Sequence, residues 1–292
     1  MAGTLLRLDK ILVERGLAAS REAACELIHG GEVTAAGLIR KKPASMLPRD
    51  VPIEIGRGGG PAWVSRGARK LIKGLDEWGI DPSGLSCVDV GASTGGFTQV
   101  LLSRGAAKVA AVDVGYGQLA WVLRNDPRVL IFERMNARYI TRDDIGWSAD
   151  LLTVDASFIS LRLLIPNLVS LISGDGVMIA LVKPQFEVGR GRAGKGVVRD
   201  PALHVEVLEG LSEFLIRDGT LRLSGATYSP IRGPEGNIEF LFLLSAGAGG
   251  LDRGTNSPGL RDEVRGRAVL DASSVDFKRI VREAHESGRT DA

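Results

Sequence analysis

The sequence contains few cysteines, few histidines and few aromatic residues. Of its 292 residues, two are cysteine, three are histidine and 5% are aromatic. Cys25 and Cys87 form no C-x-x-C pair, so we interpret both as buried thiols of a reducing compartment rather than as disulfide partners. The histidines lie far apart and near no cysteine cluster, so the sequence gives a metal site no support and we predict none.

Long apolar runs are also missing. No stretch approaches 18 uninterrupted apolar residues, and the first ten residues lack the apolar centre of a signal peptide. These absences predict a soluble, cytoplasmic protein. The net charge is only +2, but residues 1–73 carry 13 Lys or Arg and 7 Asp or Glu. We interpret this basic part as a module for a polyanion, and an ordinary solvated surface is the alternative.

The most informative stretch is a short apolar strand that ends in a glycine-rich turn. Residues 86–90 have strand composition, residues 91–96 read G-A-S-T-G-G, and helical spacing resumes at Phe97. A dinucleotide fingerprint needs glycine at the third position of the turn, where this chain has Ser93. An acidic strand end before such a turn fits S-adenosylmethionine better, because Asp89 can accept the cationic amino-acid end of that cofactor. A chance strand-to-helix turn is the alternative.

The first 55 residues are predicted to form a small α+β module. Helical spacing covers residues 5–14, and Ser20 caps a second helix that ends before Gly30. A short hairpin and a strand over residues 51–55 complete the module. A domain boundary follows, because three consecutive glycines and a proline at residues 56–62 suit neither helix nor strand.

The second predicted domain covers residues 63–246. Ser65 is expected to cap a basic helix that carries Lys70 in its first turns, and position alone favours a surface lysine there. Seven apolar strands then alternate with helices, which predicts an α/β fold with a doubly wound, mostly parallel sheet. The strands are expected at residues 86–90, 108–112, 129–132, 151–154, 177–182, 221–226 and 238–244. Residues 247–292 are a tail with a terminal helix from about Ser274.

Polar residues stand at the strand ends of this sheet, where ligands of such folds bind. Asp113 closes the second strand, 22 positions after Gly91, which is the spacing of an acidic side chain that accepts hydrogen bonds from a ribose diol. Asn136 follows the third strand and is expected at the adenine end of the cofactor. Each residue alone could merely cap a strand. The predicted cofactor-binding residues are Asp89, Gly91, Ser93, Thr94, Gly95, Gly96, Phe97, Asp113, Asn136 and Asp155.

Residues 189–195 read G-R-G-R-A-G-K and fit most of a phosphate-binding P-loop. The fit fails because Gly196 stands where a hydroxyl residue is needed and no strand directly precedes the loop. We interpret the stretch as a cationic loop that contacts RNA, with an exposed linker as the alternative. The predicted RNA-binding residues are Arg7, Lys10, Arg15, Arg21, Lys41, Lys42, Arg66, Arg69, Arg190, Arg192 and Lys195.

The N-terminal module resembles the S4 RNA-binding domain. The residues that carry this resemblance are Arg7-Leu8-Asp9, Ser20-Arg21, Leu27-Ile28, Gly31, Val33, Gly37 and Lys42-Pro43. The resemblance implies that the helical face grips structured RNA through its phosphates, which gives affinity and register without base reading.

The whole of residues 4–245 resembles the hemolysin A-type family of ribosomal RNA 2′-O-methyltransferases. Besides the S4-like module and the glycine-rich turn, the matching stretches are V-S-R-G at 64–67, D-V-G-Y-G-Q at 113–118, S-F-I-S at 157–160, K-P-Q-F-E at 183–187 and G-N-x-E at 236–239. The resemblance implies a Rossmann-like, FtsJ-type domain that uses S-adenosylmethionine. It also implies ribosomal RNA or ribosomal subunits as the partner and a cytidine of 16S or 23S RNA, or of both, as the target.

The same resemblance implies a Lys-Asp-Lys-Glu tetrad of Lys70, Asp155, Lys183 and Glu239. Glu235 competes for the last role, although Asn237 beside Glu239 fits the family better. The second lysine is expected at the ribose 2′-hydroxyl, either as the base that removes its proton or as a charge that steers it. Two other classes of function stay open, an RNA-binding assembly factor without turnover and a membrane-lytic protein.

Overall fold

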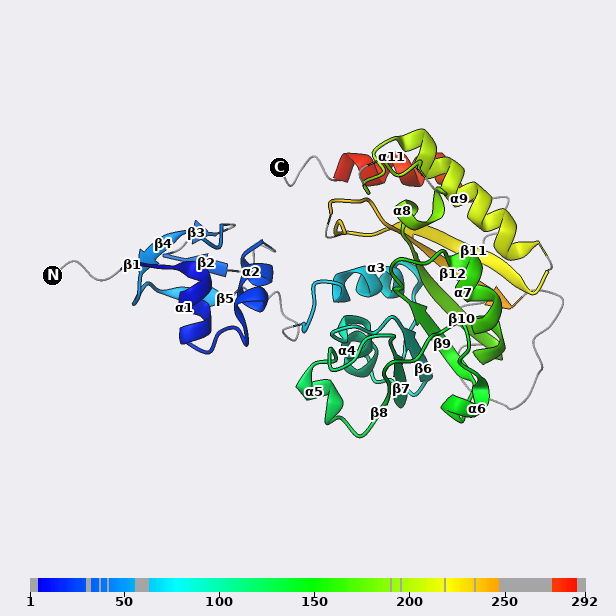
Figure 1. Ribbon diagram of the computed structural model, residues 1–292, viewed down its shortest axis with the longest axis horizontal. Helices are drawn as coiled ribbons and strands as arrows, with labels where there is room; N and C mark the ends of the chain where they lie inside the picture. Colours follow the sequence, from blue (N-terminus) through cyan, green and yellow to red (C-terminus); the bar gives the residue numbers. More distant parts are fainter. Residues whose placement is uncertain are drawn as a thin grey trace. The chain divides into compact units, whose positions relative to one another are not determined.

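The computed structural model describes residues 5–29, 33–36, 38–40, 42–55, 63–189, 191–194, 196–217, 219–233, 235–246 and 275–287. The chain divides into two compact units, Met1–Arg66 and Gly67–Ala292 (Figure 1). The predicted linker at residues 56–62 and the tail segment 247–274 lie outside the described residues. Among the described helices, none has the length and apolar character needed to cross a membrane.

The N-terminal unit combines two helices with short antiparallel strands. Its elements are β1 (Leu5–Arg7), α1 (Leu8–Glu14), α2 (Arg21–His29), β2 (Val33–Ala35), β3 (Leu38–Ile39), β4 (Met46–Pro48) and β5 (Ile53–Ile55). β1 pairs with β4, and β2 lies between β3 and β5. The core consists of side chains such as Leu8, Ile11, Leu12, Ala24 and Ile28. This is the predicted α+β arrangement.

The first residues of the predicted helix form a strand instead. Leu6 pairs with Leu47 across β1 and β4, so residues 5–7 take extended backbone and the helix begins only at Leu8. Pairing with a distant strand overrides the local helical spacing here. The cap of the second helix is confirmed, because Ser20 Oγ accepts a hydrogen bond from the amide of Ala23 at 3.2 Å. Cys25 is only half-buried, whereas Cys87 is buried, so the prediction of two buried thiols is wrong for the first.

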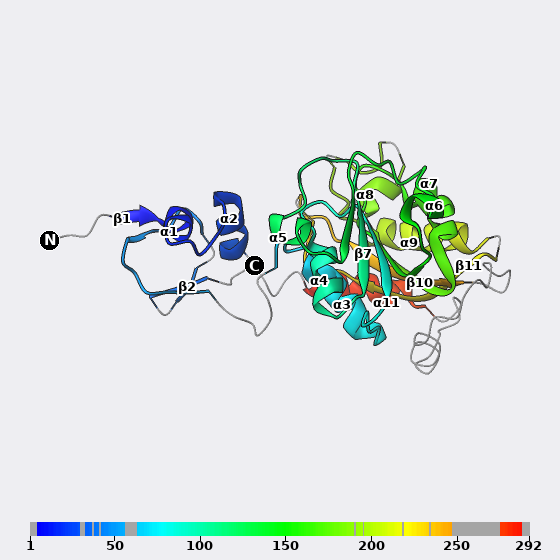
Figure 2. The same ribbon diagram turned by 90° about the horizontal axis from the view of Figure 1, so that it is seen from below.

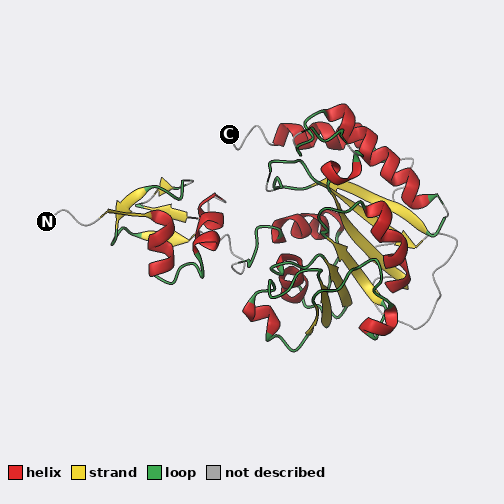
Figure 3. Cartoon of the chain, in the orientation of Figure 1, coloured by secondary structure: helices red, strands yellow, loops and turns green. Residues whose placement is uncertain are grey.

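The second unit is built on a seven-stranded sheet (Figure 3). Its strands are β6 (Ser86–Val90), β7 (Lys108–Val112), β8 (Val129–Phe132), β9 (Ala149–Val154), β10 (Ile172–Val182), β11 (Leu221–Tyr228) and β12 (Phe240–Ala246). They lie in the order β11-β12-β10-β9-β6-β7-β8. Only β12 runs against its neighbours, so the sheet is mostly parallel as predicted.

Helices cover both faces of this sheet (Figures 1 and 2). One face packs against α3 (Ala68–Trp78) and α4 (Gly96–Ser103), and the other against α7 (Leu161–Leu168), α9 (Pro201–Ile216) and α11 (Phe277–Ser287). Shorter helical segments are α5 (Trp121–Arg124), α6 (Arg142–Ile145), η1 (Val169–Leu171) and α8 (Pro184–Glu187). The doubly wound prediction is therefore confirmed.

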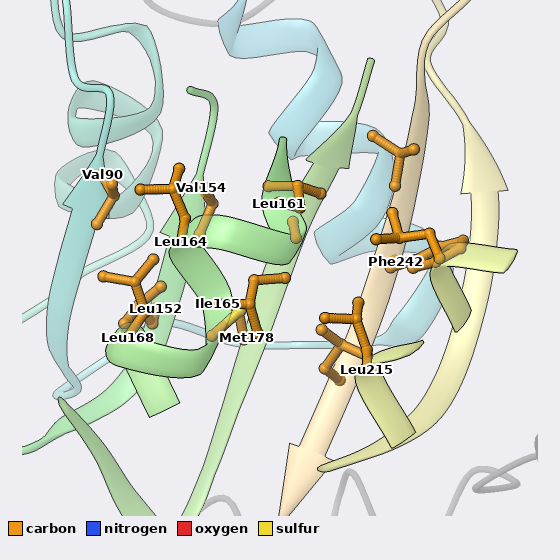
Figure 4. Close-up of a cluster of buried hydrophobic side chains, with 14 of the residues drawn as sticks. Val90, Leu152, Val154, Leu161, Leu164, Ile165, Leu168, Met178, Leu215 and Phe242 are labelled. Atoms are coloured by element: carbon orange, nitrogen blue, oxygen red, sulfur yellow. The ribbon is translucent and has the colours of Figure 1, made fainter. Parts of the chain in front are cut away.

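The largest core fills the side of the sheet under α7, α9 and α11. Figure 4 shows Leu164 and Ile165 of α7 and Leu215 of α9 packed against strand residues such as Leu152 and Phe242. The predicted terminal helix completes this core, since Phe277, Ile280, Val281 and Ala284 are all buried along one side of α11. Burial of this many apolar side chains fixes the sheet edge on which the polar residues stand.

Candidate active site

Strand register brings the predicted site residues to one edge of the sheet. Val90 pairs with Val112 on one side and Val154 on the other, and Val182 pairs with Phe240. The residues directly beyond these ends are Gly91, Asp113, Asp155 and Lys183, and Glu239 directly precedes the antiparallel strand β12. Lys70 reaches the same edge from the first turn of α3.

The four tetrad residues form a chain of ion pairs. Lys70 Nζ lies 2.6 Å from Glu239 Oε2 and 3.7 Å from Asp155 Oδ2, while Lys183 Nζ lies 2.6 Å from Asp155 Oδ1. Both lysines are 7% exposed and Glu239 is 1% exposed. The interpretation of Lys70 as a surface lysine is therefore wrong, because α3 places the Lys70 side chain at the strand ends. Glu239 joins the chain, whereas Glu235 is exposed.

Asp155 lies between the two lysines. Burial acts to raise the pKa of this carboxyl group, but the ammonium groups of Lys70 and Lys183 outweigh it and hold the pKa below its usual range. Asp155 thus carries a negative charge at neutral pH and can orient both lysine heads. Charges this far from water persist only when they are paired, so the four residues act as one electrostatic unit.

The glycine-rich turn approaches this unit through its backbone. Gly91 has a φ of +81°, and a Cβ atom built on it would lie 2.5 Å from the carbonyl oxygen of Asp155. Gly95 and even Ser93 also have positive φ values, of 97° and 49°. Only a side chain as small as hydrogen fits at Gly91, so the turn is in direct contact with the backbone of Asp155, directly after β9. A ligand in the turn would therefore lie next to Asp155.

A small pocket lies beside the turn. Its lining includes Ala92 and Ser93 of the turn, Asp113 at the end of β7, and Leu119 and Ile131 as apolar walls. The Asp113 carboxylate accepts hydrogen bonds from the amides of Ser93 and Gly115 at 2.8 and 2.6 Å. An acidic side chain above an apolar pocket is the usual arrangement for a ribose and an attached base, so these residues fit the nucleoside part of S-adenosylmethionine.

Asp89 lies beneath the turn rather than on its surface. Its side chain is 0% exposed, and its two oxygens accept hydrogen bonds from Thr98 Oγ1 at 2.7 Å and Thr153 Oγ1 at 2.9 Å. Burial raises its pKa to about 6. The direct contact with a cationic ligand that the sequence predicts is not available in this conformation. The observed role of Asp89 is to fasten α4 and β9 to the strand below the turn.

The other predicted cofactor residues divide between the turn and its surroundings. Thr94 is exposed on the turn, and Gly96 and Phe97 are buried at the start of α4. Asn136 is exposed, but its Oδ1 accepts a hydrogen bond from the amide of Arg138 at 3.0 Å and it does not line the pocket. Its predicted contact with an adenine stays a prediction.

A buried aspartate presents two of the predicted RNA-binding arginines. Asp9 is fully buried, and its carboxylate accepts hydrogen bonds from Arg7 at 2.8 Å and from Arg21 at 3.0 Å. The bond from Arg7 is the main reason why the pKa of Asp9 falls to about 2. Both guanidinium groups stay partly exposed, so their outer N–H groups can meet phosphates.

The remaining predicted RNA contacts differ in their surroundings. Lys10, Lys42 and Arg66 are exposed, and Arg69 is half-buried on α3. Two are engaged within the protein: Arg15 donates to the carbonyl groups of Arg49 and Val51, and Arg192 is paired with Glu206 at 2.5 Å. The structure thus gives Arg15 a role in the fold. Lys41, Arg190 and Lys195 lie outside the described residues.

Three residues near the tetrad were given no role by the sequence reasoning. Ser157 Oγ accepts a hydrogen bond from Lys183 Nζ at 2.8 Å, and the buried Glu187 bonds the same loop. Phe158 between them is 91% exposed and has a φ of 64°, which is strained for an aromatic residue. The runs S-F-I-S and K-P-Q-F-E, which also carry the family resemblance, contain all three residues.

Within the described ranges, no group of three His, Cys, Asp or Glu side chains could hold a metal ion. Asp155 and Glu239 are paired with lysines.

Comparison with known proteins agrees with both units. Residues 63–246 match the FtsJ-like methyltransferase family, and residues 6–51 match the S4 domain. The 16S/23S rRNA (cytidine-2′-O)-methyltransferase TlyA of Mycobacterium tuberculosis is 47% identical over 264 residues, covering 90% of this chain and 97% of that protein. The 23S rRNA (cytidine-2′-O)-methyltransferase TlyA of Campylobacter jejuni is 33% identical over 255 residues, covering 81% of this chain and 98% of that protein.

Two further relatives carry the hemolysin name. Hemolysin A of Brachyspira hyodysenteriae is 37% identical over 81% of this chain and 98% of its own length. The solved structure of a hemolysin-like protein from Streptococcus thermophilus superposes with a TM-score of 0.71 at 35% identity, covering 99% of this chain and 98% of that chain. Through the tetrad, the glycine-rich turn and these relatives over nearly the full length, the chain belongs to the TlyA family of ribosomal RNA (cytidine-2′-O)-methyltransferases.

Proposed function

We propose that this chain transfers the methyl group of S-adenosylmethionine to the 2′-oxygen of a cytidine in 16S or 23S ribosomal RNA, or in both, and that Lys70, Asp155, Lys183 and Glu239 carry out the transfer. The observation that carries the proposal is the buried chain of ion pairs among these residues, directly beside the glycine-rich turn. Ribosomal subunits as the substrate would place the reaction in the cytoplasm.

The turn and its pocket would hold the cofactor. Gly91 and Gly95 let the turn pack closely against Asp155 and Leu123, and the start of α4 offers amide groups to the carboxylate of the cofactor. Asp113 would accept hydrogen bonds from the ribose diol once its bonds to Ser93 and Gly115 adjust. S-adenosylmethionine supplies an activated methyl group on a positively charged sulfur.

The reaction itself needs alignment and the removal of one proton. A bond forms between the ribose 2′-oxygen and the methyl carbon, the bond from that carbon to sulfur breaks, and the hydroxyl proton leaves. A ribose hydroxyl is a poor nucleophile, so holding it in line with the methyl group is the main task of the protein. Lys183 Nζ has one remaining N–H direction without an acceptor among the described residues, and that direction can take the 2′-oxygen.

Lys183 can act on the 2′-hydroxyl as the base that removes its proton or as a charge that steers it. An ordinary lysine must lose its proton at a cost of roughly 4 to 5 kcal/mol to act as a base at pH 7. Asp155 Oδ1 lies 2.6 Å from Lys183 Nζ, and Ser157 Oγ accepts a hydrogen bond from the same nitrogen at 2.8 Å, so the lysine head is held in place. As a charge, Lys183 would steer the hydroxyl and stabilise negative charge on the 2′-oxygen, while the proton passes to water.

The decisive experiment is the transfer of labelled methyl groups to isolated ribosomal subunits and to free ribosomal RNA from a strain that lacks this modification. Wild-type protein should place label in alkali-resistant 2′-O-methyl dinucleotides, and the labelled subunit names the substrate. Lys183→Ala should fix no label. Lys73→Ala is the matched control, because Lys73 lies on α3 close to Lys70 but pairs with Glu77 on the surface.

An absence of label on every substrate would contradict the proposal. If RNA were still bound, an assembly factor without turnover would be the better description. Leakage of vesicles at protein concentrations that give no methylation would instead favour a membrane-lytic role.

A further inference from the structure

Two short segments meet behind the tetrad. The loop of residues 155–160 follows β9, and α8 follows β10, with Lys183 at the junction between β10 and α8. β9 and β10 pair in parallel, so the two segments leave the sheet side by side. Asp155 belongs to the first segment and Lys183 to the second, which means that the relative position of these segments sets the geometry of the central ion pair.

Ser157 connects the two segments at the reacting lysine. Its Oγ accepts a hydrogen bond from Lys183 Nζ at 2.8 Å, and Asp155 Oδ1 lies 2.6 Å from the same nitrogen. The ion pair holds the ammonium group near the carboxylate, and the hydrogen bond to Ser157 limits how the head can turn. Without Ser157, the lysine head could rotate about its contact with Asp155.

Glu187 connects the same segments at the other end. This carboxylate is buried at the end of α8 and accepts hydrogen bonds from Ser160 Oγ and from the amide of Leu161, both at 2.7 Å. Ser160 in turn caps α7 by accepting from the amide of Arg162 at 3.1 Å. Burial raises the pKa of Glu187, and the hydrogen bonds from Ser160 and Leu161 act against that rise.

The loop between the two anchors is strained. Phe158 has a φ of 64°, and its ring packs on that of Phe186 at a centroid distance of 5.2 Å. A non-glycine residue keeps such a backbone only where the surroundings over-determine it. Ser157 at one end and Glu187 at the other supply that constraint.

We propose that Ser157 and Glu187 are positioning residues that brace Lys183 against Asp155 for methyl transfer. Ser157 fixes the lysine head directly, and Glu187 acts through Ser160 and Leu161 by fixing the loop that carries both Asp155 and Ser157. The proposal rests on the proposed function for its reaction, and on the hydrogen bonds of this loop for its structure.

Single-turnover methylation tests the effect on the reaction. Ser157→Ala should lower the rate constant roughly 10- to 100-fold, the range expected when a reacting group loses its orientation. Binding of S-adenosylmethionine and of RNA should change less than twofold. Ser157→Thr keeps the hydroxyl and should keep most of the rate. Ser103→Ala, whose hydroxyl bonds only within α4, should match wild type.

A double-mutant cycle separates positioning from general destabilisation. Glu187→Gln should also lower the rate constant, and the double variant with Ser157→Ala should be no slower than the worse single variant, because both act through Lys183. Glu283→Gln on α11 is the control for a lost surface carboxylate. The proposal would be overturned if the two losses in rate constant were additive, or if Ser157→Ala left the rate constant unchanged. It would also be overturned if the losses in rate constant followed the losses in melting temperature.

Hydrogen exchange tests the brace without turnover. Glu187→Gln should speed amide exchange in the loop of residues 155–161 at least tenfold and leave β6 unchanged. If wild-type protein methylated nothing, the proposed function would fail, yet this measurement would still decide whether the brace exists. Unchanged exchange in the loop would refute it.

Discussion

The two sides of the active-site edge are built by different means. On the side of β6 and β7, the turn at Gly91 and the pocket at Asp113 shape the site mainly through backbone geometry. On the side of β9, β10 and β12, buried charged side chains do so through ion pairs. A cofactor can be held by backbone groups that never change charge, whereas moving a proton needs groups whose charge can be balanced.

The largest effect is expected when an ion pair on the side of β9, β10 and β12 is broken. Lys70→Met leaves the Glu239 carboxylate buried and opposite no ammonium group, so it should lower the free energy of unfolding by about 3 to 5 kcal/mol. Methylation should fall on the order of 1,000-fold. Chemical denaturation and single-turnover kinetics measure the two losses.

The double variant Lys70→Met with Glu239→Leu separates these two effects. Removing both charges should restore most of the stability, because a buried pair can be replaced by apolar groups at little cost. Activity should not return. A double variant as unstable as Lys70→Met would show that the pair is not the source of the stability loss.

The second prediction concerns the glycine-rich turn on the side of β6 and β7. Gly91→Ala combines a strained φ of +81° with a Cβ atom 2.5 Å from the carbonyl oxygen of Asp155, so we expect a loss of roughly 3 kcal/mol together with weaker cofactor binding. Gly84→Ala is a matched control, since its φ is +74° but no atom lies within 4 Å of the added carbon. It should lose only about 1 kcal/mol. Equal losses in urea denaturation would mean that the contact with Asp155 is unimportant.

The same division explains what the sequence could predict. The side of β6 and β7 is local in sequence: the strands at residues 86–90, 108–112 and 129–132 have the predicted bounds, and glycine spacing located the turn. The ion pairs join residues from separate elements, so no local pattern predicts that Lys70 is buried, and the family resemblance alone singled it out. The roles of Ser157 and Glu187 were missed for the same reason, because their partners lie more than 20 positions away.

Asp89 shows a further limit of sequence reasoning. In a parallel sheet covered on both faces, strands are apolar throughout, so the alternation of faces leaves no visible pattern. The acidic strand end was therefore expected to face a ligand, whereas it faces Thr98 of α4. Tertiary pairing likewise decides that residues 5–7 form a strand.

The third prediction contrasts two aspartates, Asp89 within β6 and Asp155 directly after the neighbouring strand β9. Burial raises the pKa of Asp89 to about 6, so the folded state binds a proton more tightly than the unfolded state, and the stability from this group is lost as pH rises from about 4 to 6. Asp89→Asn should remove that decline and raise stability at pH 8 by roughly 2 to 3 kcal/mol.

The pKa of Asp155 is lowered, so its contribution has the opposite sign. It is present above the ordinary aspartate pKa and is lost as pH falls. Asp155→Asn should therefore destabilise the protein at pH 8, where Asp89→Asn stabilises it. Denaturation curves between pH 4 and 8 compare both variants with wild type, and parallel pH profiles for the two variants would contradict the assignment of opposite environments.

The smallest effect on stability is expected at Phe158, an exposed ring in the loop that follows β9. A base stacked on an aromatic side chain contributes about 1 to 3 kcal/mol, so Phe158→Ala should lower kcat/KM for ribosomal substrate roughly 10-fold or more. The ring is 91% exposed, and its loss should leave the free energy of unfolding nearly unchanged. Phe158→Trp should retain activity, and Leu163→Ala, another exposed apolar residue, is the control.

Phe158→Gly distinguishes the ring from the backbone that carries it. Glycine adopts a φ of 64° without strain, so this variant should gain about 1 kcal/mol of stability while losing the same activity as Phe158→Ala. A protein that keeps a strained aromatic residue in solvent at the expense of stability uses that ring for something outside the fold. Full activity in Phe158→Gly would show instead that the ring does not contact substrate.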